Sequence, residues 1–327
     1  MATAEQLKSL IKSHLEGDEA HFLSVAMQMA ASEARTGHGK LAQEIRLLID
    51  EAKSRKQAIE PSRKSIPIAQ PRGELSLLLT VAYPKIRLAE MILEVEVFER
   101  LTRLIKEHRQ ITKIRSHGLS PRKKLLLIGP PGTGKTMSAG VLAGELGLPL
   151  FVVRLDSLIT KYMGETAAKL RLIFDAIGQT RGVYLFDEFD SIGSQRGLGN
   201  DVGEIRRILN SFLQLIEQDE SDSILLAATN HPDILDFALY RRFDDIIQYD
   251  LPNRELIIKA LQSKLVAFKK SEIDWNELAD IATGLSYADI SRACEEAIKD
   301  TIINDRKKIE NADILKTLSE RNAIRNK

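Results

Sequence analysis

Residues 129–136 read GPPGTGKT, which matches the phosphate-loop pattern G-x-x-x-x-G-K-[ST]. An apolar run (LLLIG, 125–129) precedes the loop and a helical pattern (135–146) follows it, as such a loop requires. Glycines let the backbone wrap with its N–H groups pointing at phosphate oxygens, and the positive end of the following helix points at the same anion. The loop therefore predicts a nucleotide site, with Lys135 at the β- and γ-phosphates and the Thr136 hydroxyl on Mg²⁺. The predicted nucleotide contacts in the loop are Gly129, Pro130, Pro131, Gly132, Thr133, Gly134, Lys135 and Thr136.

Two carboxylates end another apolar run, VYLFDE (183–188). The carboxyl ends of buried strands in α/β sheets open into the ligand crevice. We therefore expect Asp187 to bind Mg²⁺, and Glu188 to orient and polarise the attacking water. Asp190 lies on the same turn and is interpreted as a helix cap or structural acid in preference to a catalytic group.

The run ILLAATN (224–230) brings Asn230 to the end of a further strand. A neutral amide at this place could hold the attacking water near the γ-phosphate. Asn-His-Pro is also turn chemistry, so the residue by itself fits either role. Together with the phosphate loop and the two carboxylates, it favours the role of a γ-phosphate sensor.

Two adjacent arginines occur in ALYRRFDD (238–245). Arg241 and Arg242 could pair with the two aspartates that follow. They could also reach the γ-phosphate of a neighbouring subunit, where an arginine neutralises transition-state charge. The spacing alone leaves both alternatives open.

The order of apolar and helical segments predicts the fold class. Short apolar runs that alternate with helical patterns are typical of a parallel sheet covered on both faces. After Pro252 the pattern is helical to residue 327, and residues 1–57 also show helical periodicity. The segment between them and residue 75 is rich in proline and basic residues, which indicates a flexible tether at 58–74. The runs predicted as strands are 125–129, 150–155, 183–188 and 224–230.

Composition excludes several classes of protein. The chain has 327 residues, 43% hydrophobic and 28% charged, with a net charge of +1, so no global field attracts nucleic acid or a membrane surface. No apolar run approaches the length of a membrane span, and the first residues carry charges where a signal peptide would be apolar. The single cysteine, Cys294, fits a reducing compartment and is interpreted as a buried structural thiol. We expect a cytoplasmic protein.

These motifs together resemble AAA+ ATPases, specifically the clade of substrate-remodelling AAA proteins. The resemblance covers about 75–327, and its elements occur in the family's order: GPPGTGKT, KYMGET, VYLFDE, the ATN run, RRFDD and GLSYADISRACEEA. It implies an ATPase that uses ATP and Mg²⁺. It also implies a P-loop α/β sheet of five parallel strands at 75–253 and a small helical lid at 254–327. Six subunits of this family usually form a ring with ATP between neighbours, so a homo-hexamer is expected.

The resemblance assigns roles to individual residues. It gives Glu188 the catalytic role, Asp187 the magnesium role and Asn230 the role of first sensor. The family's arginine fingers lie in a longer R-x-G-R-F-D stretch, which is compressed here, so Arg242 keeps the second finger position and Arg241 is the candidate for the first. Gly284 and Ala288 match adenine-side residues of the lid, although Tyr287 stands where relatives carry a small residue. The family's base-contacting segment before the phosphate loop has no match, so the residues of 75–95 that meet the base stay unassigned.

In the resembling proteins, the loop that corresponds to KYMGET (161–166) projects into the central channel of the ring. The resemblance therefore implies a pore loop of Tyr162, Met163 and Gly164, in which Tyr162 and Met163 grip an extended polypeptide and Gly164 lets the loop tilt. Aromatic area and adaptable methionine bind most peptide sequences. Packing of Tyr162 within its own domain is the alternative. A glycine-rich stretch (193–201) is a candidate second pore loop or a solvated loop, and Lys161, Arg196 or Arg206 could add charge to the channel.

The expected function is ATP-driven protein remodelling or unfolding, a chaperone-like activity that threads polypeptide through the ring. Residues 1–57 would recruit the substrate or an adaptor. The chain has no H-E-x-x-H motif, so degradation of its targets would need a separate protease. Two alternatives remain: a nucleic-acid motor, which would call for a basic channel, and a regulatory scaffold, which would not need Glu188.

Overall fold

The structure is a computed structural model, and it describes residues 25–27, 29–30, 43–44, 71–158, 163–189, 202–231, 240–268 and 270–325. The chain divides into two units, Met1–Pro67 and Ile68–Lys327. In the first unit, residues 25–27, 29–30 and 43–44 are helical, and Val25, Ala26 and Ala30 are buried. The rest of the predicted N-terminal domain (1–57) and most of the predicted tether (58–74) lie outside the described residues. That division of the chain stays a prediction.

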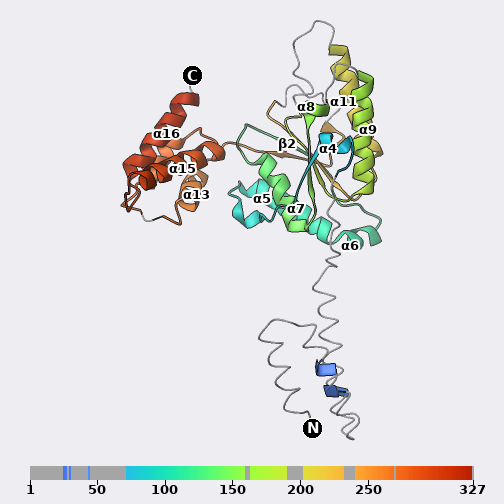
Figure 1. Ribbon diagram of the computed structural model, residues 1–327, viewed down its shortest axis with the longest axis horizontal. Helices are drawn as coiled ribbons and strands as arrows, with labels where there is room; N and C mark the ends of the chain where they lie inside the picture. Colours follow the sequence, from blue (N-terminus) through green and yellow to red (C-terminus); the bar gives the residue numbers. More distant parts are fainter. Residues whose placement is uncertain are drawn as a thin grey trace. The chain divides into compact units, whose positions relative to one another are not determined.

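The second unit is built on a six-stranded sheet in the order β1-β3-β4-β5-β2-β6 (Figure 1). Five of these strands are parallel neighbours, which confirms the predicted parallel sheet. The sixth, β1, pairs antiparallel with β3 at one edge and was not predicted. The strands are β1 (Leu79–Ala82), β2 (Lys124–Ile128), β3 (Leu150–Val153), β4 (Val183–Phe186), β5 (Ile224–Thr229) and β6 (Asp245–Gln248).

Helices cover both faces of the sheet, as Figure 1 shows. The helices α5 and α7 contribute to a core on one face, with Leu101, Leu142 and Leu226 fully buried in it. The helices α9 and α11 contribute to a core on the other face, around Leu170, Tyr184 and Phe212. The helical segments of this part are α4 (Leu75–Leu78), η1 (Leu88–Glu90), α5 (Val95–Arg109), α6 (Ile111–Ser116), α7 (Lys135–Leu146), α8 (Leu155–Leu158), α9 (Met163–Gln179) and α11 (Val202–Gln218).

The C-terminal part is a helical subdomain with its own core. Its helices are α13 (Arg254–Lys264), α14 (Trp275–Ala282), α15 (Tyr287–Ile303) and α16 (Asn311–Arg325). Side chains cap three of them: Asn253 accepts from the N–H of Leu256, Asp274 caps α14, and Ser286 forms a capping box with Asp289. Cys294 is fully buried in this core, which confirms its structural role, and burial raises the pKa of its thiol to about 12. The predicted helical lid is confirmed.

Candidate active site

The phosphate loop joins the end of β2 to the start of α7 and depends on glycine at three places. Gly129, Gly132 and Gly134 have φ values of 147°, 76° and 106°, in the region that side chains disfavour. A Cβ atom at Gly129 would lie 2.0 Å from the carbonyl oxygen of Tyr249. The backbone N–H of Tyr249 in turn donates to the carbonyl of Ile128 at 2.7 Å. The loop is therefore fixed against the chain that follows β6.

Lys135 connects the loop to the neighbouring strand end. Only 6% of this residue is exposed, and its Nζ donates to the carbonyl oxygens of Gly129 at 2.7 Å and Pro130 at 2.8 Å. The same ammonium donates to Oδ1 of Asn230 at 2.8 Å. The structure thus brings together the lysine and the asparagine that were both predicted from the sequence to lie in the site. A buried ammonium held among acceptors at a helix start suits a bound polyphosphate.

Thr136 and Asp187 also meet. The Thr136 hydroxyl donates to Oδ2 of Asp187 at 2.7 Å, and Oδ1 of Asp187 accepts from the N–H of Glu188 at 3.0 Å. A hydroxyl and a carboxylate are the oxygen ligands that Mg²⁺ prefers, and such sites complete their shell with water and phosphate. The donor set present here fits this ion.

Glu188 is held in an unusual backbone conformation. Its φ is 50°, one of two positive values among non-glycine residues of the described chain. Such a conformation costs on the order of 1–3 kcal/mol and persists only where the surroundings impose it. Here the flanking Phe186 and Phe189 are buried, and the N–H of Phe189 donates to the carbonyl of Ala228 at 2.9 Å. The exposed carboxylate therefore stands on a turn that is fixed at both ends.

A buried hydroxyl pair beneath the loop was missed by sequence reasoning. The Tyr249 hydroxyl donates to Oγ of Ser138 at 2.7 Å, and Ser138 donates to the Gly134 carbonyl at 3.0 Å. Burial raises the pKa of Tyr249 to about 12, against the lowering effect of the Ser138 hydrogen bond. The phenol is thus a neutral support under the start of α7. Its sequence signal was weak because β6, DIIQ, is short and has polar ends.

The lid touches the loop through the first turn of α15. The N–H of Ala288 donates to the carbonyl of Gly132 at 3.2 Å, and a Cβ at Gly132 would meet Oγ of Ser286 at 2.5 Å. Gly284, with φ 89°, instead lies against Arg325 within the lid, where an added Cβ would be 2.7 Å from Nη1. Burial, and next the charge of Glu94, raise the pKa of Tyr287 to about 12.

The segment between η1 and α5 (91–94) lies in the range 75–95, where no base-contacting residue could be assigned from the sequence. The methyl carbon Cε of Met91 lies 3.2 Å from a Cβ built at Gly134, and Leu93 lies 4.0 Å from the same point. Ile92 packs against the core of the lid. This segment has no recognisable sequence motif. Only its contacts with the loop and the lid make it a candidate part of the site.

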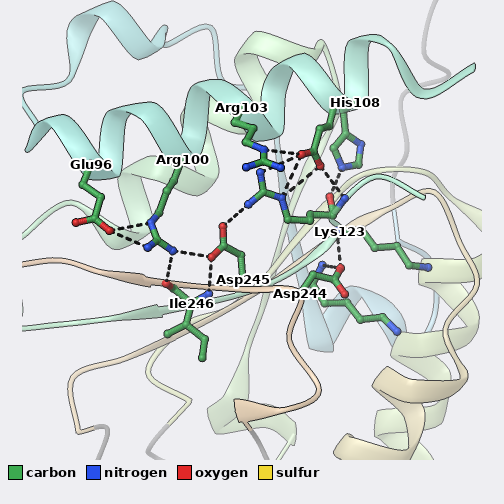
Figure 2. Close-up of polar contacts among 11 residues, drawn as sticks. Glu96, Arg100, Arg103, His108, Lys123, Asp244, Asp245 and Ile246 are labelled. Atoms are coloured by element: carbon green, nitrogen blue, oxygen red, sulfur yellow. Dashed lines mark hydrogen bonds and ion pairs between the residues drawn. The ribbon is translucent and has the colours of Figure 1, made fainter. Parts of the chain in front are cut away.

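The arginine pair is followed by two aspartates, Asp244 and Asp245, whose contacts are drawn in Figure 2. Oδ2 of Asp244 accepts from the N–H groups of Lys123 at 2.8 Å and Lys124 at 2.9 Å. Asp245 forms ion pairs with Arg100 at 2.7 Å and with Arg122 at 2.6 Å. The two aspartates are thus engaged by groups other than the adjacent arginines. Arg242 forms an ion pair with Glu217, whose Oε1 lies 2.7 Å from Nε, and Arg241 is exposed.

The rest of the predicted site falls outside the described residues or at their edge. Lys161, Tyr162, Asp190 and the stretch 193–201, with Arg196, are not described. The helix α9 begins at Met163 and includes Gly164 in its first turn, but their side chains are not described, nor is that of Arg206. Glu165 is exposed in the first turn of α9, where an acid is favourable.

Residues 125–251 match the family model described as ATPase family associated with various cellular activities (AAA). The loop, the two strand ends and the arginine pair all lie within this range. An uncharacterized AAA family ATPase of Sinorhizobium fredii, y4kL, is 35% identical over 322 residues, which is 98% of this chain and 96% of that protein.

Longer relatives and a solved structure share the same region. The ATP-dependent zinc metalloprotease FtsH 4 of Sphaerobacter thermophilus is 32% identical over 72% of this chain, but over 37% of its own length. FtsH of Pseudomonas putida is 37% identical over 54% of this chain and 30% of its own length. The crystal structure of the FIGL-1 AAA domain superposes with a TM-score of 0.61 at 25% identity, covering 80% of this chain and 91% of that one. Within the described residues, none of the helices combines the length and the apolar character that crossing a membrane requires.

Proposed function

The chain belongs to the AAA family and is an ATPase, and from this premise we propose that it uses ATP hydrolysis to remodel or unfold protein substrates. The FtsH relatives are named as ATP-dependent proteases, and their similarity to this chain supports a protein substrate. The single observation that carries the proposed chemistry is the convergence of Lys135 with Asn230 and of Thr136 with Asp187.

Residues 129–136 form the proposed phosphate site. The N–H groups of the loop would face the phosphates, and Lys135 would exchange a carbonyl or amide acceptor for a phosphate oxygen as nucleotide binds. Met91 and Leu93, with Gly284 and Ala288 of the lid, are proposed on the side of the base. The apolar atoms of Met91 and Leu93 near Gly134 and the contact of Ala288 with Gly132 support that position.

Thr136 and Asp187 would hold Mg²⁺, which would neutralise charge that develops on the phosphates. Glu188 is proposed to orient the attacking water and accept its proton. The fixed turn on which it stands supports this role, because a positioned base needs little reorganisation. Asn230 would hold the water or the γ-phosphate oxygen beside Lys135, so that loss of the γ-phosphate changes its contacts.

Arg241 and Arg242 are proposed to act on the nucleotide of a neighbouring protomer, which requires a homo-oligomer, a hexameric ring in our proposal. Tyr162, Met163 and Gly164 would line its channel and grip the polypeptide, with a second loop at 193–201. Small rotations driven by hydrolysis would then pull the chain. Residues 1–57 would recruit the substrate or an adaptor, and a separate protease would be needed for degradation. We place this activity in the cytoplasm.

The variant Glu188→Gln tests this proposal. It keeps the size of the side chain but removes the base, so kcat for ATP should fall by at least about 100-fold. Affinity for ATP should persist, and the ATP-bound variant should retain an unfolded model protein such as permanently unfolded casein. Turnover in the variant close to wild type would reject the role of Glu188.

The wild-type protein supplies the comparison between function classes. Stimulation of its ATPase by unfolded casein supports remodelling. Stimulation by DNA but not by unfolded protein would instead indicate a nucleic-acid motor. An ATP-dependent change in assembly without any turnover would indicate a regulatory scaffold.

A further inference from the structure

Arg242 is held within its own chain by a carboxylate. Its Nε lies 2.7 Å from Oε1 of Glu217, and the two side chains are 30% and 53% exposed. The contact is an ion pair between the guanidinium and the carboxylate. Attraction between the charges therefore helps to hold the guanidinium beside α11.

Glu217 is an unfavourable residue for its place in the helix. It lies in the last turn of α11, which carries no basic residue there. The C-terminal end of a helix has a partial negative charge, so an acid in this turn costs helix stability. Arg242 is the partner that offsets this cost. Glu217 also influences Lys124: burial lowers the pKa of this lysine, and the charge of Glu217 acts against that lowering.

The backbone beside Arg242 is already fixed. Phe243 is 8% exposed and belongs to the core, while Asp244 and Asp245 are anchored to the start of β2 and to α5 as Figure 2 shows. Only the long side chain of Arg242 remains to be oriented. An arginine has several rotatable bonds, and orienting it in advance reduces the entropy lost on reaching a transition state.

We propose that Glu217 is a positioning residue for ATP hydrolysis: its carboxylate directs Arg242 toward the γ-phosphate bound by the neighbouring protomer. This rests on the proposed function, because it requires Arg242 to act in trans. The helix that carries Glu217 also carries Phe212, whose ring lies 4.6 Å from that of Phe189, next to Glu188. The helix α11 is about 25 Å long and thus contacts two parts of the proposed site. One is the turn that carries Glu188, which would act in cis, and the other is Arg242, which would act in trans.

The first test is Glu217→Gln, which keeps the side-chain shape and removes the charge. We expect kcat to fall about tenfold with KM for ATP unchanged. Thermal stability should change little, because partly exposed ion pairs contribute little to folding. Glu217→Asp keeps the charge and should recover most of the activity. Glu220→Gln removes an exposed carboxylate three residues along the chain and should leave kcat unchanged. Equal activity of Glu217→Gln and wild type would overturn the proposal.

Mixing variants separates action in trans from action within one protomer. A Glu188→Gln protomer lacks the base but retains the pair of Glu217 and Arg242. An excess of it should therefore raise turnover per Glu217→Gln protomer several-fold. Absence of this rescue would overturn the proposal. The mixture of Glu188→Gln with Arg242→Ala is the reference. If wild type hydrolyses ATP but this mixture shows no rescue, Arg242 does not act on a neighbouring protomer, and that part of the proposed function is wrong.

A double variant tests whether Glu217 acts through Arg242. In that case Glu217→Gln combined with Arg242→Ala should be no slower than Arg242→Ala alone. If the losses of kcat multiply instead, Glu217 acts through another group, and Lys124 is the first candidate. That result would overturn the assignment.

Discussion

At Gly129 the phosphate loop approaches the chain after β6 so closely that no side chain fits. The φ of 147° and the 2.0 Å from a built Cβ to the Tyr249 carbonyl oxygen act together. Gly129→Ala must therefore move the loop or the strand end, at about 2–3 kcal/mol of stability. We expect its affinity for a non-hydrolysable ATP analogue, measured by calorimetry, to fall by about tenfold or more.

Gly147→Ala is the matched control for that variant. Gly147 ends α7 with φ 64°, but a Cβ there would meet nothing within 4 Å. Its cost should be about 1–2 kcal/mol of backbone strain, with nucleotide affinity unchanged. Equal losses of affinity in both variants would show that unfolding of the loop helix, and not the contact with Tyr249, controls the site.

At the scale of elements, an aromatic cluster joins two helices to β4, the strand that precedes the turn of Glu188. The ring of Phe212 on α11 lies 5.9 Å from Phe174 on α9, 4.9 Å from Phe186 and 4.6 Å from Phe189. Phe212→Leu keeps the site apolar but loosens the packing of Phe189. Stability should therefore fall by about 1–2 kcal/mol, and kcat should change more than KM. Ile216→Val removes buried volume from the same helix, and about 1 kcal/mol of stability, without touching kcat. Parallel decreases of kcat in both variants would contradict a specific role for the rings.

Elements with a strong local signal could be predicted, and those defined by their neighbours could not. Fully apolar runs such as VYLF and LLAAT show buried central strands, and the glycine loop shows the start of α7. The edge strand β1 has one buried residue in four, and β6 has one as well. Met91 and Ile92 have no signal of their own: Met91 lies near Gly134 of the loop, and Ile92 packs against the core of the lid. The pairing of Arg242 with Glu217 joins residues from two elements and has no signal in either.

At the scale of the whole molecule, the second unit has two subdomains with separate cores. The two subdomains meet at the phosphate loop. The sheet and the lid each bury their own apolar residues, and the N–H of Ala288 reaches the carbonyl of Gly132 across the junction. A shift of the loop would therefore reach the first turn of α15 through this hydrogen bond.

A chain that starts at Ile68 tests how the work is divided along the molecule. The unit Ile68–Lys327 contains every residue proposed for the nucleotide site and all three of the hydrophobic cores described above. Basal ATPase should therefore stay within about twofold of the full chain, since a unit with its own core folds alone. Remodelling of a native substrate should be lost, because residues 1–57 are proposed to recruit it, whereas stimulation by unfolded casein should remain. Loss of basal turnover would instead indicate that the first unit is needed to assemble the catalytic ring. Substrate recruitment would then not explain the effect of removing that unit.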